Sequence, residues 1–247
     1  MNLLRTLPAA LALAALVTAP AVLAQAKVDI GDTPLIARSA LFGNPVKSGA
    51  QLSPDGKWLT WMAPLNGVMN VWAAPVDQPT KAKPLTDSKD RPIPGYGWSG
   101  NSEQVLFVQD KGGDENYRLY GVNVTTGAKH DYTPFDKVRA QTIGGSRKRL
   151  DEMLVGINNR DPRWHDVYLL NLKSGELKLV MQGDGFAGFV SDDDLQVRLA
   201  ARPNAAGGMD YFSVTDGKVA DKPTVSTGLE DVSTSPLGLT VDGKTLY

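Results

Sequence analysis

The residues that could carry covalent catalysis are few in this sequence. It contains no cysteine and only two histidines, His130 and His165. A serine nucleophile needs a base within reach, and the G-x-S-x-G turn that presents such a serine is absent, because Ser99 and Ser146 both lack the second glycine. His165 and Asp166 are neighbours in an expected strand, so their side chains point to opposite faces. We therefore expect no catalytic residue in this chain, and both histidines at the surface.

Motifs for cofactors and metals are equally weak. Two stretches match G-x-G-x-x-G, at 95–100 and 183–188, but neither is followed by a helical pattern, which dinucleotide binding requires. The three carboxylates Asp192–Asp194 lack the spacing of a calcium-binding loop and fall at a turn, where Asp is common. We expect a solvated corner there, and neither a cofactor nor a metal site.

Composition describes an ordinary globular protein. The chain has 247 residues, of which 42% are hydrophobic and 21% charged, and its formal net charge is −1. No basic excess is available to neutralise phosphates, so nucleic acid is not an expected partner. Without cysteine the fold depends on packing and on backbone hydrogen bonds rather than on disulfides.

The first 24 residues have the pattern of a secretory signal peptide. Arg5 precedes an apolar run, and small residues follow it. Cleavage is expected between Ala24 and Gln25, with cleavage after Ala26 as the alternative. The apolar stretch between Pro8 and Pro20 is shorter than the roughly 20 residues of a membrane span. We therefore expect a secreted or periplasmic protein with no membrane association once the signal is removed.

The rest of the chain is repetitive. A small-polar turn recurs at intervals of 45 to 49 residues, and in the second to fourth repeats a later turn carries a glycine at its tip. The first turn centres on Ser53, Ser99, Ser146, Ser191 and Thr240, and the later glycines are Gly127, Gly175 and Gly217.

Each repeat reads as four short alternating strands, the unit of a β-propeller blade. A β-sandwich is the alternative, which the regular period disfavours. We expect an all-β fold with four blades of four antiparallel strands and the start of a fifth. The last residues fall within a strand signal, and an unclosed propeller exposes strand edges, so we expect a fragment of a longer polypeptide. Residues 25–48 form an expected N-terminal arm, and 49–247 the partial propeller.

Several stretches resemble the prolyl oligopeptidase family of serine peptidases, in its acylaminoacyl-peptidase and dipeptidyl-aminopeptidase-like branch. They include "LIARSALFGNP", "LSPDGKWLTWMAPLNGVMNVW", "GDENYRLY" and "NNRDPRWHDVY", and the similarity runs from Leu35 to Leu177. The resemblance implies a propeller of about seven blades that caps a C-terminal α/β-hydrolase domain. It also implies hydrolysis of short peptides through an acyl-enzyme, with the propeller excluding folded proteins and residues 25–48 packing against the hydrolase domain. The alternative is a stand-alone periplasmic propeller that acts as an interaction scaffold.

An acidic turn, "KGGDENYR" at 111–118, is the candidate site. As a corner, its two glycines supply positive φ angles, Asp114 and Asn116 bond backbone N–H groups, and Glu115 pairs with Arg118. As a substrate-binding site, Asp114 or Glu115 faces an interdomain cavity and binds the free amine of a peptide. Both interpretations remain open from the sequence.

Overall fold

The computed structural model describes residues 34–231 and 233–247, so the expected signal peptide and its cleavage site at Ala24 and Gln25 lie outside the described residues. The described residues fall into two units, one that ends at Phe42 and one that comprises 43–247. In the first unit, the short helix α1 (Arg38–Phe42) has no buried residue. Within the described residues, no helix is both long and apolar enough to cross a membrane.

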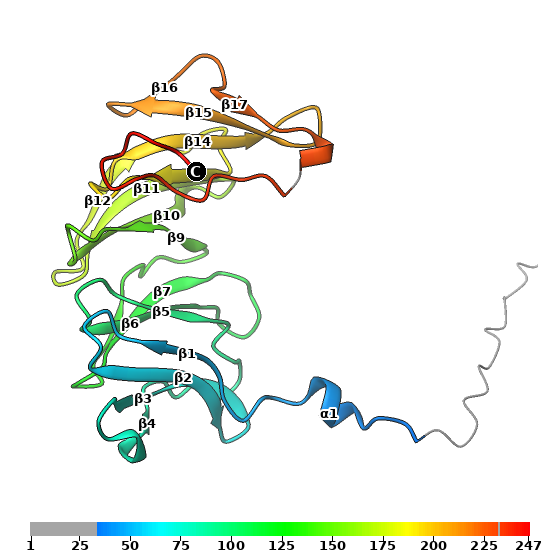
Figure 1. Ribbon diagram of the computed structural model, residues 1–247, viewed down its shortest axis with the longest axis vertical. Coiled ribbons are helices and arrows are strands. Elements are labelled where there is room, and N and C mark those ends of the chain that lie inside the picture. Colours follow the sequence, from blue (N-terminus) through cyan, green and yellow to red (C-terminus); the bar gives the residue numbers. More distant parts are fainter. Residues whose placement is uncertain (1–33, 232) are drawn as a thin grey trace, which may run out of the picture. The chain divides into compact units, whose positions relative to one another are not determined.

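The second unit consists of sheets whose antiparallel strands follow one another in chain order (Figure 1). The first sheet contains β1 (Ser48–Leu52), β2 (Trp58–Leu65), β3 (Val68–Pro75) and β4 (Lys83–Pro84), and the second contains β5 (Tyr96–Trp98), β6 (Gln104–Gln109), β7 (Arg118–Asn123) and β8 (Lys129–Asp131). The third contains β9 (Ala140–Gly145), β10 (Glu152–Asp161), β11 (Trp164–Asn171) and β12 (Leu177–Met181), and the fourth β13 (Gly188–Ser191), β14 (Val197–Pro203), β15 (Met209–Thr215) and β16 (Lys218–Val219).

Two short 3-10 helices and one extra strand complete the elements of the described residues. The helices are η1 (Pro79–Lys81) and η2 (Leu229–Asp231), and the extra strand β17 (Val225–Ser226) pairs with β15. The repeated four-stranded meander confirms the predicted propeller blades.

The first turn of each repeat is built by one side chain that closes the corner between two strands. Ser53 Oγ donates to Asp55 Oδ1 at 2.6 Å and accepts the backbone N–H of Trp58 at 3.0 Å. Thr240 repeats this arrangement at the start of the fifth repeat, where it accepts the N–H of Thr245 at 3.0 Å and Leu239 bridges to Leu246. The structure therefore confirms four blades and the beginning of a fifth.

In the fourth repeat the corner residue is Asp192, and the prediction of Ser191 was wrong by one position. Asp192 Oδ1 accepts the backbone N–H groups of Asp194 and Gln196 at 3.0 and 2.9 Å. Ser191 is instead the last residue of β13. A carboxylate and a hydroxyl both accept N–H groups, so either can close this turn.

The later glycines occupy turns that only a left-handed backbone closes. Gly127, Gly175 and Gly217 have φ angles of +74°, +76° and +73°. These nearly equal values, at the same point of three blades, explain why the sequence repeats glycine there.

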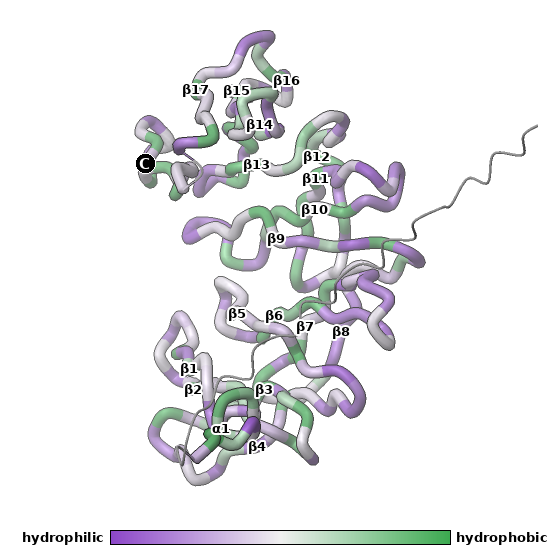
Figure 2. Tube along the Cα trace, turned by 90° about the vertical axis from the view of Figure 1, so that its right-hand side faces the viewer, coloured by the Kyte–Doolittle hydropathy of each residue, from purple (hydrophilic) through white to green (hydrophobic). Residues whose placement is uncertain are grey.

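The core lies between successive sheets, because each inner strand buries both faces. In β10, Leu154 packs toward the fourth sheet with Val197 and Val214, while Val155 packs toward the second sheet with Leu119. Figure 2 shows hydrophobic stretches along β10 and β11 beside hydrophilic turns. Burying one such side chain stabilises the fold by about 1.5–3 kcal/mol. These layers hold the turns at both ends of the sheets in place.

Candidate functional site

The acidic turn connects β6 to β7 and has the positive φ angles that its glycines predicted. Gly112 and Gly113 have φ angles of +67° and +87°. Asp114 Oδ1 accepts the backbone N–H groups of Lys111 and Asn116 at 3.2 and 3.1 Å, which confirms its structural role. The Asn116 side chain donates to Asp114 Oδ2 at 3.1 Å, and this bond, with that of the Asn116 N–H, lowers the pKa of Asp114. The Asp114 carboxylate is thus used within the turn.

Glu115 behaves differently, and its predicted pairing with Arg118 was wrong. Arg118 lies in β7 and pairs with Asp131 at 3.3 Å and with Asp136 at 2.9 Å. Glu115 is exposed, and within the described part of the chain its carboxylate makes no hydrogen bond or ion pair. Its φ angle of +58° is unusual for a residue other than glycine and costs about 1–2 kcal/mol. Of the two candidate residues, Glu115 therefore presents the available carboxylate.

The connector between β4 and β5 braces this turn. Arg91 Nε lies 3.7 Å from Asp110 Oδ1, and Asp110 Oδ2 accepts the N–H of Glu115 at 3.4 Å. A Cβ on Gly113 would lie 3.6 Å from a terminal nitrogen of Arg91. Sequence analysis missed Arg91 because it belongs to the preceding repeat, and no local spacing connects it to the turn.

A second polar cluster lies at the matching turn of the third sheet, between β10 and β11. Arg160 donates to both oxygens of Asp166, at 2.7 and 2.8 Å, and to Asp184 at 2.9 Å. The Asp166 side chain is only 1% exposed and also accepts the N–H of Gly183 at 2.8 Å. The Arg160 guanidinium holds the pKa of Asp166 below its usual range. This network could not be predicted from sequence spacing, because its members come from three separate segments.

Two of the stretches that carry the family resemblance, 113–120 and 158–168, are joined in space. The Arg139 guanidinium lies 5.5 Å from the centre of the Tyr117 ring, and the Arg139 N–H donates to Asn158 Oδ1 at 2.6 Å. Asn158 Nδ2 in turn donates to the carbonyl oxygen of Pro162 at 3.1 Å. Arg139 therefore connects the turn between β6 and β7 with the turn between β10 and β11.

Neither histidine is arranged as a catalytic base. His130 is exposed, as predicted, but His165 is half-buried, and its Nε2 atom is buried without a hydrogen-bond partner in the described structure. The prediction of a surface position was wrong for His165, because its side chain packs against Gly156. Burial lowers the pKa of His165. Asp166 bonds to Arg160 and Gly183 on the opposite face, as strand alternation predicted.

A hollow of about 950 Å³ runs along the first strands of the second, third and fourth sheets. Its lining comes mainly from β5, β9, β13 and residues 236–239, and it does not include Asp114 or Glu115. Ser99 and Ser146 line it, but both hydroxyls close corners: Ser99 Oγ donates to Asn101 Oδ1 at 2.7 Å and Ser146 Oγ to the Asp193 carbonyl at 2.6 Å. These serines hold the backbone and are not poised as nucleophiles.

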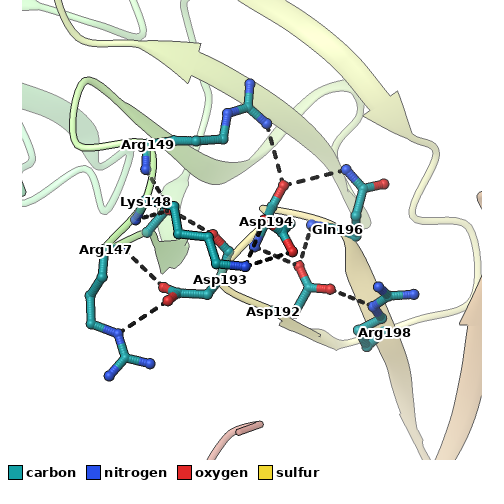
Figure 3. Close-up of polar contacts among 9 residues, drawn as sticks. Arg147, Lys148, Arg149, Asp192, Asp193, Asp194, Gln196 and Arg198 are labelled. Carbon is teal, nitrogen blue, oxygen red and sulfur yellow. Dashed lines mark hydrogen bonds and ion pairs between the residues drawn. The ribbon is translucent and has the colours of Figure 1, made fainter. Parts of the chain in front are cut away.

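The corner at Asp192–Asp194 is a clamp between the third and fourth sheets (Figure 3), and the prediction of a solvated corner was wrong. Asp193 accepts from Arg147 Nε at 3.2 Å, and Asp194 accepts from Lys148 Nζ at 2.9 Å. Asp192 is buried, which opposes its ionisation, but the Gln196 N–H and the Arg198 guanidinium outweigh burial and lower its pKa.

The described residues contain no group of three or more His, Cys, Asp and Glu side chains that could hold a metal ion. The glycine-rich stretch 95–100 contains the short strand β5, the stretch 183–188 leads into β13, and neither begins a helix, as predicted. Their backbone is therefore not arranged like a dinucleotide-binding turn.

No family model matches the sequence. Among curated proteins, dipeptidyl aminopeptidase BIII of Pseudoxanthomonas mexicana is 44% identical over 220 residues, which cover 88% of this chain and 32% of the relative. Dipeptidyl peptidase family member 6 of Caenorhabditis elegans is 33% identical over 203 residues, covering 79% of this chain and 27% of the relative. The chain thus spans about a third of the length of the curated relatives it matches.

Solved structures also include proteins with a similar fold. The β-propeller domain of the Trilobed protease from Pyrococcus furiosus superposes with a TM-score of 0.51 and 16% identity, covering 77% of this chain and 59% of that chain. This similarity supports the propeller fold, and the sequence identity to the curated peptidases supports the family. The chain therefore belongs to the prolyl oligopeptidase family of serine peptidases, as an N-terminal β-propeller portion in its acylaminoacyl-peptidase and dipeptidyl-aminopeptidase-like branch.

Proposed function

We propose that this chain is the non-catalytic propeller portion of a secreted serine peptidase that hydrolyses short peptides. The observation that carries the proposal is its 44% identity, over 88% of its length, to a protein named dipeptidyl aminopeptidase. The nucleophile, base and oxyanion hole belong to an α/β-hydrolase domain of the same polypeptide, which forms an acyl-enzyme and then hydrolyses it. The propeller admits short peptides and excludes folded proteins.

Within this function, the Glu115 carboxylate binds the free α-amine of the peptide. Three observations support this role over a purely structural one: the side chain is exposed, its carboxylate has no partner among the described residues, and its left-handed backbone is held by Asp110 and braced by Arg91. A backbone held in a disfavoured conformation is found more often at ligand sites than elsewhere. Asp114 shapes the turn and does not bind substrate.

The test is Glu115→Gln in the full-length peptidase, assayed with matched substrates that carry a free or an acetylated N-terminus. Losing the charge raises KM for free-amine substrates about tenfold, equivalent to about 1.4 kcal/mol, and leaves the acetylated substrates unchanged. Glu103→Gln is the control, because Glu103 is also exposed but lies at the other end of the same sheet. Equal small losses on both substrates, with a lower melting temperature, would show that the turn is only a corner.

The N-terminal arm packs against the hydrolase domain in this proposal. Leu35, Ile36, Leu41 and Phe42 have exposed fractions between 60% and 82%, which is unusual for four large apolar side chains so close in sequence. Replacing Leu41 and Phe42 with Ser should lower the melting temperature of the full-length protein. If the melting temperature of the full-length protein does not change, the arm packs elsewhere.

Export is the remaining part of the proposal. It is supported by the cationic, apolar and small-residue order of the first 24 residues. N-terminal sequencing of the protein from the extracytoplasmic fraction should begin at Gln25. A protein that retains Met1 and stays in the cytoplasm would contradict export but not the peptidase role.

A further inference from the structure

Among the described residues that line the 950 Å³ hollow, Arg147 is the one cation. Its backbone N–H and its Nε both donate to the Asp193 carboxylate, at 2.8 and 3.2 Å. That carboxylate is firmly held, since the Asp193 side chain is only 9% exposed and its carbonyl accepts from Ser146 Oγ. The Arg147 guanidinium is thus held by Asp193 at its Nε edge.

The other edge of the same guanidinium is open. The two terminal nitrogens make no hydrogen bond to a described residue, and the side chain is 71% exposed. Figure 3 shows these nitrogens directed away from Asp193 and from the rest of the clamp. A guanidinium with one edge anchored and the other free is prepared to accept a second carboxylate through two parallel hydrogen bonds.

The carboxylates that line the hollow are already neutralised. Glu152 pairs with Arg149 at 2.5 Å, Asp192 with Arg198 at 2.6 Å, and Asp193 with Arg147 itself. Small or neutral residues, including Gly97, Thr142 and Gly144, make up much of the remaining wall. The open edge of Arg147 is therefore the point in this wall that distinguishes an anionic ligand from a neutral one.

We propose that Arg147 binds a carboxylate of a peptide inside the hollow, either the C-terminal carboxylate or an Asp or Glu side chain. This inference rests on the proposed function, in which short peptides enter the propeller. It makes Arg147 a specificity-determining residue that favours peptides with a negative charge. It assigns no part in bond cleavage to Arg147, because the site is built on a propeller corner.

The experiment compares N-acetylated peptides in the full-length peptidase, so that binding of a free amine does not contribute. One pair differs only in a free or amidated C-terminus, and a second pair only in Glu or Gln. Arg147→Gln should lower kcat/KM for the charged member of at least one pair about threefold, the scale of an exposed ion pair, and spare the neutral member. Arg147→Lys keeps the positive charge but not the two parallel hydrogen bonds, so it should retain only part of the preference. The pair that responds identifies which carboxylate is bound.

The control is Lys57→Gln, since Lys57 is 77% exposed at the same corner of the first sheet but does not line the hollow. If Lys57→Gln lowered kcat/KM for the charged peptides as much as Arg147→Gln does, the effect would come from the overall charge of the protein, and the inference would be overturned. An equal loss of kcat/KM on charged and neutral peptides in Arg147→Gln would show a structural effect and would also overturn it. If the protein cleaves no peptide, the proposed function fails, but binding of the same peptides still tests Arg147 through the fluorescence of Trp98, which lines the hollow. Equal affinities for charged and neutral peptides would then overturn the inference.

Discussion

Replacing the buried carboxylate of Asp166 with an amide should destabilise the third blade strongly. Asp166→Asn keeps the size of the side chain but removes its charge, and with it three charge-assisted hydrogen bonds: two from Arg160 and one from the Gly183 N–H. The amide also directs an NH2 group toward one of these donors. The perturbation therefore acts on the connection between the end of β10 and the segment that leads into β13, the first strand of the next blade.

The magnitude follows from burial. Hydrogen bonds to a charged group contribute about 1.5–3 kcal/mol each, and breaking a fully buried ion pair costs about 3–5 kcal/mol. Asp166 is 1% exposed, but Arg160 is 36% exposed and keeps Asp184 as a second partner, so solvent and Asp184 recover part of the loss. We expect Asp166→Asn to lower the free energy of unfolding by about 2–4 kcal/mol.

Urea unfolding followed by tryptophan fluorescence measures this change, and Asp161→Asn is the matched control. Asp161 pairs with Arg163 in the same turn, but Arg163 is 74% exposed, so solvent screens the pair and its loss should be hard to detect. Similar losses in the two variants would refute the argument from burial.

The effect should also depend on pH. Because the folded pKa of Asp166 lies below its unfolded value, the carboxylate stabilises the fold above about pH 4 and loses this contribution as pH falls through the folded pKa. The difference between wild type and Asp166→Asn should therefore shrink in acid. A difference that stays constant down to pH 2 would mean that the amide disturbs packing and not ionisation.

Three other predictions follow from neighbouring contacts. Gly183→Ala should unfold the third blade, because the new Cβ would overlap the His165 carbonyl oxygen, whereas a Cβ on Gly188 would meet nothing within 4 Å and Gly188→Ala should be tolerated in the same thermal melt. The free energy of unfolding of the wild type should fall as pH drops below about 6.5, because His165 binds a proton more readily in the unfolded chain than in its buried folded position. His165→Gln should reduce this dependence of stability on pH. Asp193→Asn should lower the melting temperature and reduce its sensitivity to salt, since the Arg147 pair is lost.

The blades could be predicted because their signals are local. Each corner is closed by a side chain that bonds to N–H groups two to five residues away, as Ser53 does, so the residue type recurs with the repeat. The positive φ angles of Gly127 and Gly175 also depend only on their own turns. A fold made of four such units can be inferred from one sequence without knowledge of any long-range contact.

The polar contacts of the candidate site could not be predicted in the same way, because their partners come from other strands or repeats. Arg118 is three residues from Glu115, yet as part of β7 it faces β8, where Tyr120 and Asp131 are register partners, and it pairs with Asp131. Likewise, Arg91 and Asp110 meet only because the connector and the turn after β6 reach the same end of one sheet. Sequence spacing therefore predicted where the turn lies, but not which of its carboxylates is free.

Asp192 shows how a corner can acquire charge without losing its structural role. A carboxylate closes the turn as a hydroxyl does, but it must be neutralised when buried, and Arg198, two residues into β14, supplies the cation. The next two residues, Asp193 and Asp194, face the third blade and form ion pairs with Arg147 and Lys148. Asp193 occupies only one edge of the Arg147 guanidinium. The contact that joins the third and fourth sheets therefore leaves the other edge of this cation free in the wall of the hollow.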